Sequence, residues 1–330
     1  MAGDRLKVTR RALAPLGAAL ALPSCQEPPK PKAVAGPPGN SAVFIAKAAN
    51  YRVELASKID EGLSACGLDV RGKNVLLKPN LVEYSIDTEI NTHVAVIAAA
   101  LEVFRKRGAA SVRIGEGPGH RRDTVELVEL TGYRSLLTGF DDLFVDLNRD
   151  DVDMVRNFAN RPEFFFPKTV LGADLIVSVA KMKTHHWAGA TLSMKNLFGL
   201  VPSAIYGWPK NTLHRIGVEN AILALNRKFR NTFAIVDGIV GMEGNGPIQG
   251  TPKAAGVLVM GRDVVAVDAT CSRIMGLEPA RMKYLAGAAD LGHIAAARIE
   301  QRGERVQAVA TRFNVIPEHK ELLRGTEELG

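Results

Sequence analysis

The sequence predicts an α/β protein with a mainly parallel sheet and helices on both of its faces. From residue 42 onward, short apolar runs that are typical of strands alternate with longer amphipathic stretches that are typical of helices. The breaks between these elements are short. Strands that alternate with helices in this way form parallel sheets that are covered on both faces.

The first elements are the clearest. Alternating strands and helices are expected at 42–48, 51–67, 73–80, 92–108 and 111–117. Thr92 is the expected N-cap of the fourth element, and Lys106 and Arg107 suit the negative end of its dipole. Gly67 and Gly108 are expected to end the two helices. The order strand, helix, strand, helix, strand therefore begins a doubly covered sheet.

The remaining elements are less regular. Further strands are expected at 144–148, 163–171, 174–180 and 256–261, and residues 233–247 are expected to be a strand that runs into a glycine-rich loop. Further helices are expected at 214–229, 263–276 and 279–292. Residues 120–165 are a candidate lid or subdomain inserted between strands. The chain has no internal repeat, and no stretch after the N-terminal segment has the length of a membrane span.

Composition indicates an ordinary globular protein. Of the 330 residues, 46% are hydrophobic and 23% are charged. The net charge is +7, of which the first 25 residues carry +3. No long basic run or basic stripe interleaved with aromatic residues is present, so nucleic acid is not an expected partner. The oligomeric state stays open.

The N-terminus has the pattern of an export signal. The twin arginine Arg10–Arg11 precedes a short apolar run, Ala12–Leu22, and the motif "LPSC" follows with Cys25. This order resembles a twin-arginine signal that leads into a lipoprotein cleavage site. A disordered basic tail is the alternative. The expected location is the periplasm or the cell surface, with a lipid on Cys25 as the expected membrane anchor.

The pattern divides the chain into a signal at 1–25, a Pro-rich linker at 26–41 and an α/β domain at 42–330. Apart from Cys25, the cysteines are Cys66 and Cys271. Both lie in helical patterns, so two buried free thiols are expected, and one disulfide is the alternative. No C-x-x-C spacing occurs, so an iron–sulfur cluster is not expected.

Polar and charged side chains gather in four loops that follow strands, and ligands of open parallel sheets bind at that edge. The motifs are "LLKPNLV", "RIGEGPGH", "VAKMKTHHWAGATLSMKNLFG" and "IVDGIVGMEGNGP". They supply Lys78, Asn80, Gly115, Glu116, Gly117, His120, Lys181, Lys183, His185, Lys195, Asn196, Asp237, Glu243 and Gly244. Glycines let the backbone approach a ligand, and lysines attract anions.

Roles follow from residue type. The residues with predicted catalytic roles are Lys183, His185, Glu116 and Asp237. His185 and Glu243 are candidate metal ligands, and a metal ion is a candidate cofactor. The other residues of the four loops would hold an anionic cofactor or ligand, and the first amides of a short helix at Lys195 would assist. The alternatives are solvated lysines and histidines at the surface, and tight turns at the glycines.

The motifs "VLLKPNLV", "IGEGPG", "VAKMKTHHWAGATLSMKNLFG" and "DGIVGMEGNGP" resemble, in this order, the domain-of-unknown-function family 362 over about residues 42–295. Some members carry a ferredoxin-like segment that this chain lacks, so the resemblance implies no cluster here. The family is also similar to the nickel-pincer lactate racemases, which hold a nucleotide-derived cofactor through lysine and histidine. That similarity implies Lys181 or Lys183, and His185, as the corresponding residues.

Two classes of function follow. One is an exported enzyme that uses a metal or an anionic cofactor on a small anionic molecule. The other is a surface-tethered protein that binds an anionic ligand without catalysis. A desolvated base in the cationic pocket would distinguish the enzyme. The topology also predicts that six side chains converge on one pocket, namely Lys78, Glu116, Lys183, His185, Lys195 and Asp237.

Overall fold

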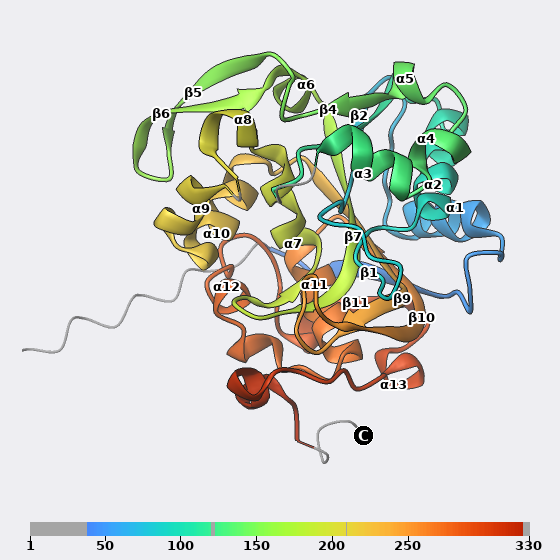
Figure 1. Ribbon diagram of the computed structural model, residues 1–330. Helices are drawn as coiled ribbons and strands as arrows, with labels where there is room; N and C mark the ends of the chain where they lie inside the picture. The colour runs from blue at the N-terminus through green and yellow to red at the C-terminus, as the bar shows by residue number, and fades with distance from the viewer. Residues whose placement is uncertain (1–37, 120–122, 209, 326–330) are drawn as a thin grey trace, which may run out of the picture. The chain divides into compact units, whose positions relative to one another are not determined.

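A mainly parallel sheet of nine strands runs through the described part of the chain, residues 38–119, 123–208 and 210–325 of a computed structural model (Figure 1). In spatial order its strands are β11 (Ile299–Gly303), β1 (Ser41–Lys47), β10 (Thr251–Gly261), β9 (Thr232–Glu243), β7 (Leu175–His185), β2 (Asn74–Pro79), β3 (Ser111–Glu116) and β4 (Phe144–Asp146). The short β8 (Gly189–Thr191) pairs with β7. The predicted fold class is confirmed.

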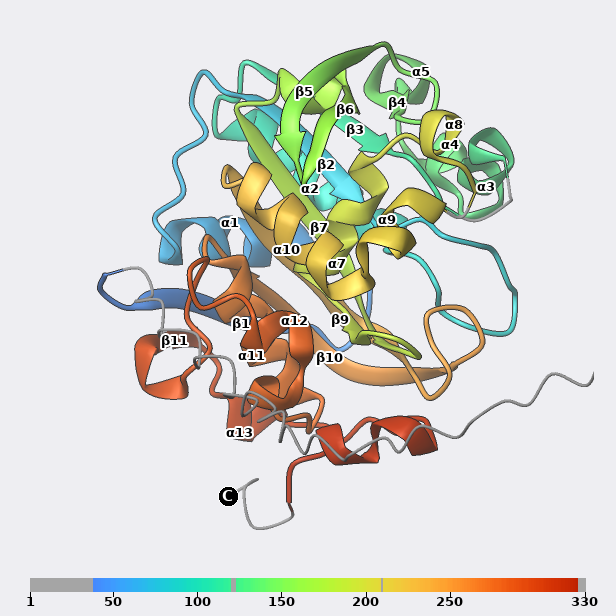
Figure 2. The same ribbon diagram turned by 90° about the vertical axis from the view of Figure 1, so that its left-hand side faces the viewer.

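Helices cover both faces of this sheet. Helices α1 (Leu55–Ala65) and α2 (Val94–Lys106) pack with Leu77 and Val179 on one face. Helices α10 (Val218–Lys228) and α11 (Val264–Ile274) supply buried residues to the clusters on the other face. Figure 1 shows the first pair to the right of the sheet, and Figure 2 shows α10 in front of β7 and β9.

Within the nine-stranded sheet, antiparallel pairing occurs in three places. Strand β10 runs antiparallel to both β1 and β9, and β8 turns back on β7. Two strands are longer than predicted. Strand β7 extends beyond 174–180 to His185, and β9 continues to Glu243 through most of the segment in which a glycine-rich loop was expected. Asp237 therefore lies inside a strand, where the sequence predicted a loop.

The predicted helix over 214–229 is two helices, α9 (Asn211–Ile216) and α10, because Gly217 between them adopts a φ of +91°. The predicted helix over 279–292 contains the short 3₁₀ helix η2 (Pro279–Arg281) and helix α12 (Lys283–Ala286). The remaining helices and strands are short: α3 (Thr124–Leu130), α4 (Tyr133–Leu136), α5 (Phe140–Leu143), β5 (Val152–Phe158), β6 (Arg161–Pro167), α6 (Lys168–Leu171), α7 (Ser193–Asn196), η1 (Leu197–Leu200), α8 (Ser203–Tyr206), η2 (Pro279–Arg281), α12 (Lys283–Ala286), η3 (Ala296–Arg298), α13 (Val306–Val309) and η4 (Pro317–Leu322).

The described part of the candidate insertion at 120–165 contains α3, α4, α5, β4 and β5. Strands β5 and β6 form a separate antiparallel hairpin. Three phenylalanines of the hairpin pack with Phe229 at the end of α10, namely Phe158, Phe164 and Phe166. These aromatic contacts fix the hairpin against the second face of the sheet.

Smaller predictions have mixed outcomes. The N-cap of α2 is His93, whose Nδ1 accepts a hydrogen bond from the backbone N–H of Ala95 at 3.2 Å. Thr92 instead donates to Val179 O at 2.6 Å and accepts from Asn80 N at 2.9 Å, so its predicted cap is wrong. Cys66 and Cys271 are both buried and free, as expected.

The export signal, most of the linker and His120 lie outside the described residues. Within the described ranges, no helix combines the length and the apolar character that crossing a bilayer requires.

Candidate functional site

A cavity of about 250 Å³ opens at the carboxyl ends of β2, β3 and β7. Five of the six side chains that were expected to converge line it, namely Lys78, Glu116, Lys183, His185 and Lys195. Asn80, Gly117 and Asn196 line it as well. The parallel strands thus bring residues from three predicted loops to one place.

Lys78 forms the base of the cavity. Its ammonium donates to Glu116 Oε2 at 2.6 Å, to Asn196 Oδ1 at 2.7 Å and to Pro79 O at 2.8 Å. The Lys78 and Glu116 side chains are each 1% exposed. Burial lowers the pKa of Lys78, and the neighbouring Glu116 carboxylate opposes that shift. This pair is internally satisfied, so it organises the site and adds no net charge.

Glu116 is itself held by the backbone. Its Oε1 accepts from Gly117 N at 3.0 Å, and its Oε2 accepts from Leu81 N at 3.1 Å. Gly199 packs directly on the ion pair, because a Cβ at this position would collide with Glu116 Oε1 and Lys78 Nζ. Only glycine fits there.

Two further buried lysines have no carboxylate partner among the described residues. Lys183 donates to Ile90 O at 2.8 Å and to Pro247 O at 3.3 Å. Lys210 donates to Gly117 O at 2.6 Å and to Phe198 O at 2.7 Å. Burial lowers the pKa of Lys183 well below its usual value and lowers the pKa of Lys210 to about 7. Both pKa values would rise if an anion bound beside them.

Lys195 differs from the other lysines of the cavity. Its ammonium lies 4.8 Å from the centre of the Phe198 ring and has no hydrogen-bond partner within the described part of the chain. Burial, followed by repulsion from Lys78, lowers the pKa of Lys195 to about 8. A large fraction of this side chain is therefore the neutral amine near pH 8.

Helix α7 carries Lys195 and is held by a buried carboxylate. Asp268 accepts from Ser193 N at 2.8 Å and from Met194 N at 3.1 Å. The first amides of this short helix therefore bind the protein's own Asp268, which corrects the prediction that they would bind a ligand. Asp268 positions Lys195 and Asn196 from below the site.

His185 has a defined tautomer. Its Nδ1 accepts from the backbone N–H of Trp187 at 3.0 Å and of Ala188 at 3.2 Å. Because both partners are donors, the proton of the neutral ring is on Nε2. Burial lowers the pKa of His185 well below its usual value, so the ring is a neutral donor at physiological pH.

Two polar atoms of the cavity wall lack hydrogen-bond partners. Asn80 Oδ1 and Thr191 Oγ1 are buried, and neither contacts a donor or acceptor in the described part of the chain. Buried polar atoms are normally paired. A ligand with a hydroxyl or a second oxygen would satisfy them.

Some predicted site residues lie elsewhere. Lys181 donates to Asp237 Oδ2 at 3.1 Å and to the Tyr51 hydroxyl at 2.9 Å, and neither Lys181 nor Asp237 lines the cavity. Asp237 also accepts from His93 N at 3.1 Å and thereby stabilises the N-terminus of α2. The predicted catalytic role of Asp237 and the predicted ligand-binding role of Lys181 are not supported by these contacts.

Three other predictions have structural explanations. A Cβ on Gly115 would lie 2.9 Å from Leu76 Cδ1, so this glycine permits close strand packing and does not line the cavity. Gly244 has a φ of +82° and pairs with Val315 outside the cavity. Glu243 accepts from Asn314 N and Asn314 Nδ2, both at 2.9 Å, and does not line the cavity either.

The donor set does not fit a metal ion. Neutral His185 has its proton on Nε2 and its Nδ1 lone pair occupied by two backbone donors. Glu243 is bound to Asn314, and no group of three or more histidine, cysteine, aspartate or glutamate side chains suited to a metal occurs within the described residues. A cavity of 250 Å³ is also below the range of about 300–1,000 Å³ that is common for cofactor sites.

Several cavity residues were not predicted. Lys210, Gly199, Trp187 and His214 line the cavity together with an apolar set, Leu81, Val82, Phe198, Pro247 and Ile248. Lys210 and His214 follow no strand, so the topological argument could not find them. Trp187 and Gly199 stand inside the motif "KMKTHHWAGATLSMKNLFG", and its density of functional groups was the available signal.

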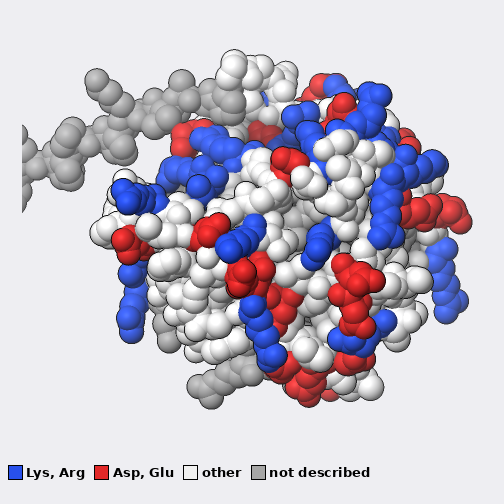
Figure 3. All heavy atoms as spheres, turned by 90° about the horizontal axis from the view of Figure 1, so that it is seen from above, with Lys and Arg blue, Asp and Glu red and all other residues white. Residues whose placement is uncertain are grey.

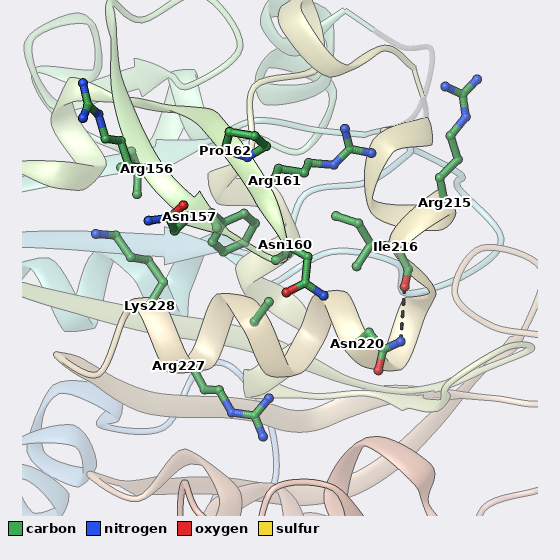
Figure 4. A pocket seen from close by; sticks show the side chains of 14 residues that line it. Arg156, Asn157, Asn160, Arg161, Pro162, Arg215, Ile216, Asn220, Arg227 and Lys228 are labelled. Carbon is green, nitrogen blue, oxygen red and sulfur yellow. Dashed lines mark hydrogen bonds between the residues drawn. The ribbon is translucent and has the colours of Figure 1, made fainter.

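A second hollow, of about 1,020 Å³, lies between the β5–β6 hairpin and α10 (Figure 4). Its cations stand around an open rim, and Arg227 turns away to pair with Asp290 at 2.8 Å. Acidic and basic side chains are interspersed on the top face of the molecule (Figure 3). No buried titratable group lines this hollow, so the smaller cavity is the candidate site.

Comparison with known proteins gives the class. Residues 75–273 match the family described as a domain of unknown function, DUF362, and this chain belongs to that family. A thylakoid-associated protein of Synechocystis sp. is 30% identical over 235 residues, which cover 67% of this chain and 68% of that protein.

Two solved structures are more distantly similar. The lactate racemase apoprotein of Thermoanaerobacterium thermosaccharolyticum is 13% identical, with a TM-score of 0.47, over 72% of this chain and 57% of that one. A protein of Thermotoga maritima is 17% identical, with a TM-score of 0.37, over 63% and 56%. The chain thus spans little more than half the length of either structure.

We predict that Gly199→Ala lowers the free energy of unfolding by about 1–3 kcal/mol, because the added Cβ displaces the buried Lys78–Glu116 pair. Urea unfolding measures the change. The matched control is Gly172→Ala, whose Cβ would meet its nearest atom, Lys168 O, at 3.3 Å at an exposed position. Equal effects of the two substitutions would contradict the packing role of Gly199.

Proposed function

We propose that the protein is an enzyme that binds a small anion in the cavity and removes a proton from it, with the Lys195 amine as the base. The observation that carries the proposal is a partly exposed amine on the cavity wall, with its pKa lowered to about 8, that has no hydrogen-bond partner in the described chain. A general base is most effective when its pKa lies near the working pH.

The charges favour an anionic substrate. Lys78 is neutralised by Glu116, whereas Lys183, Lys195 and Lys210 have no carboxylate partner in the described part of the chain. Burial is the main cause that lowers the pKa values of these three lysines, and repulsion from neighbouring lysines adds to it. A carboxylate or phosphate would relieve that repulsion.

The roles follow from these contacts. Lys183 and Lys210 would each donate a hydrogen bond to the anionic group and keep their present hydrogen bonds to backbone carbonyls. The Lys195 amine would take a proton from the substrate and become an ammonium. His185 would donate its Nε2 hydrogen to an oxygen on which negative charge develops, as a neutral ring can. A protein that only binds an anion has no need of a free amine.

We predict that the protein catalyses exchange of a carbon-bound hydrogen next to the carboxyl group of a small 2-hydroxy or 2-oxo acid in D₂O. Proton NMR follows the loss of the signal. Lys195→Met should slow exchange at least about 100-fold, which is the usual contribution of a general base. Lys283→Met, at an exposed position on α12, is the control. Saturable anion binding without exchange would contradict catalysis and leave a binding protein.

We also propose that the protein is exported and anchored by a lipid on Cys25. The order of twin arginine, apolar run and cysteine supports this proposal. Replacing Arg10 and Arg11 with lysine should retain the protein in the cytoplasm, as cell fractionation would show. Cys25→Ala should release the protein from membranes. Unchanged export, or continued membrane attachment, would contradict the corresponding part.

A further inference from the structure

We infer that the ligand of the cavity is amphipathic, with an anionic end held by the buried lysines and an apolar body that extends past Trp187 toward solvent. This inference rests on the proposed anion site and adds the class of molecule that fills it. It is based on the arrangement of the cavity wall, in which charged side chains lie at the inner end and apolar side chains lie at the outer end.

Two lysines without a carboxylate partner among the described residues lie deep in the cavity. Lys78 is buried as well, at 1% exposed, but Glu116 neutralises its charge. Lys183 is 0% exposed and Lys210 is 2% exposed. Their charges face a volume that other protein atoms shield from bulk water. An anionic group is therefore stabilised at the inner end, where screening is weakest.

The outer wall is apolar. Val82, Phe198, Pro247 and Ile248 line the cavity and are each partly exposed. Trp187 lies farthest out, with 56% of its surface exposed, although an indole of this size is usually buried. Its ring packs edge-on against His186 and His214, at centroid distances of 4.6 Å and 5.3 Å, so the indole is held at the rim.

A fully hydrated anion, such as free phosphate, would leave this apolar wall unused. A ligand with an apolar body would cover the wall and the face of Trp187, and burial of apolar surface would then add to the charge attraction. The size is bounded too. A volume of 250 Å³ equals that of about eight water molecules, so the buried part of the ligand has about eight non-hydrogen atoms.

The test uses straight-chain carboxylates from acetate to octanoate, with affinity measured by isothermal titration calorimetry on the folded protein. Each added methylene group should tighten binding about fourfold until the wall is covered, after which affinity should level off. Alkylammonium ions of the same lengths should bind far more weakly. Equal affinity along the carboxylate series, or preference for the ammonium series, would overturn the inference.

The two tryptophans of the chain give a matched pair of variants. Trp187→Ala should reduce the gain per methylene at least twofold while acetate binding stays unchanged. Trp208→Ala is the control, since Trp208 is 38% exposed and does not line the cavity. Identical slopes in the two variants would overturn the role of Trp187.

The outcomes also separate this inference from the proposed function. If acetate binds and the longer carboxylates bind no more tightly, only the inference of an amphipathic ligand is contradicted. Failure of every carboxylate to bind would contradict the anion site as well.

Discussion

The buried contact of Lys78 with Glu116 and Asn196 is the interaction on which the site depends. It joins β2, β3 and α7, three elements that are far apart in sequence, through hydrogen bonds of 2.6 Å and 2.7 Å. An ammonium buried without a partner would cost several kcal/mol, so the contact also selects this arrangement of the three elements. Gly199 has no side chain because this contact occupies the space where one would lie.

Because Lys78 and Glu116 pair with each other at the base of the cavity, the surrounding lysines are left without a carboxylate partner in the described part of the cavity wall. These lysines are Lys183, Lys195 and Lys210. Lys183 and Lys210 donate hydrogen bonds to backbone carbonyls, whereas the Lys195 ammonium lies beside the Phe198 ring. The fold thus keeps one amine at the cavity wall partly exposed and without a hydrogen-bond partner among the described residues, which is useful for chemistry.

The sequence correctly predicted where the cavity lies, but it did not correctly predict every residue that lines it. The parallel topology explains why Lys78, Glu116 and His185 meet. It failed for Asp237, because the glycines of "VDGIVG" were interpreted as a loop, whereas the strand continues to Glu243. It failed for Lys181 because a register shift separates it from Lys183, although two-residue spacing places side chains of a regular strand on one face. Lys210 belongs to an irregular segment whose position only tertiary packing fixes.

The most direct measurement is the pKa of the Lys195 ammonium, followed by NMR of ¹³C-labelled lysine, with Lys195→Arg used to assign the signal. The account predicts a pKa of about 8 in the free protein and a clear rise when acetate is added, because a bound anion stabilises the charged form. A pKa near 10.5 that acetate does not change would contradict the account, since Lys195 would then be an ordinary solvated ammonium.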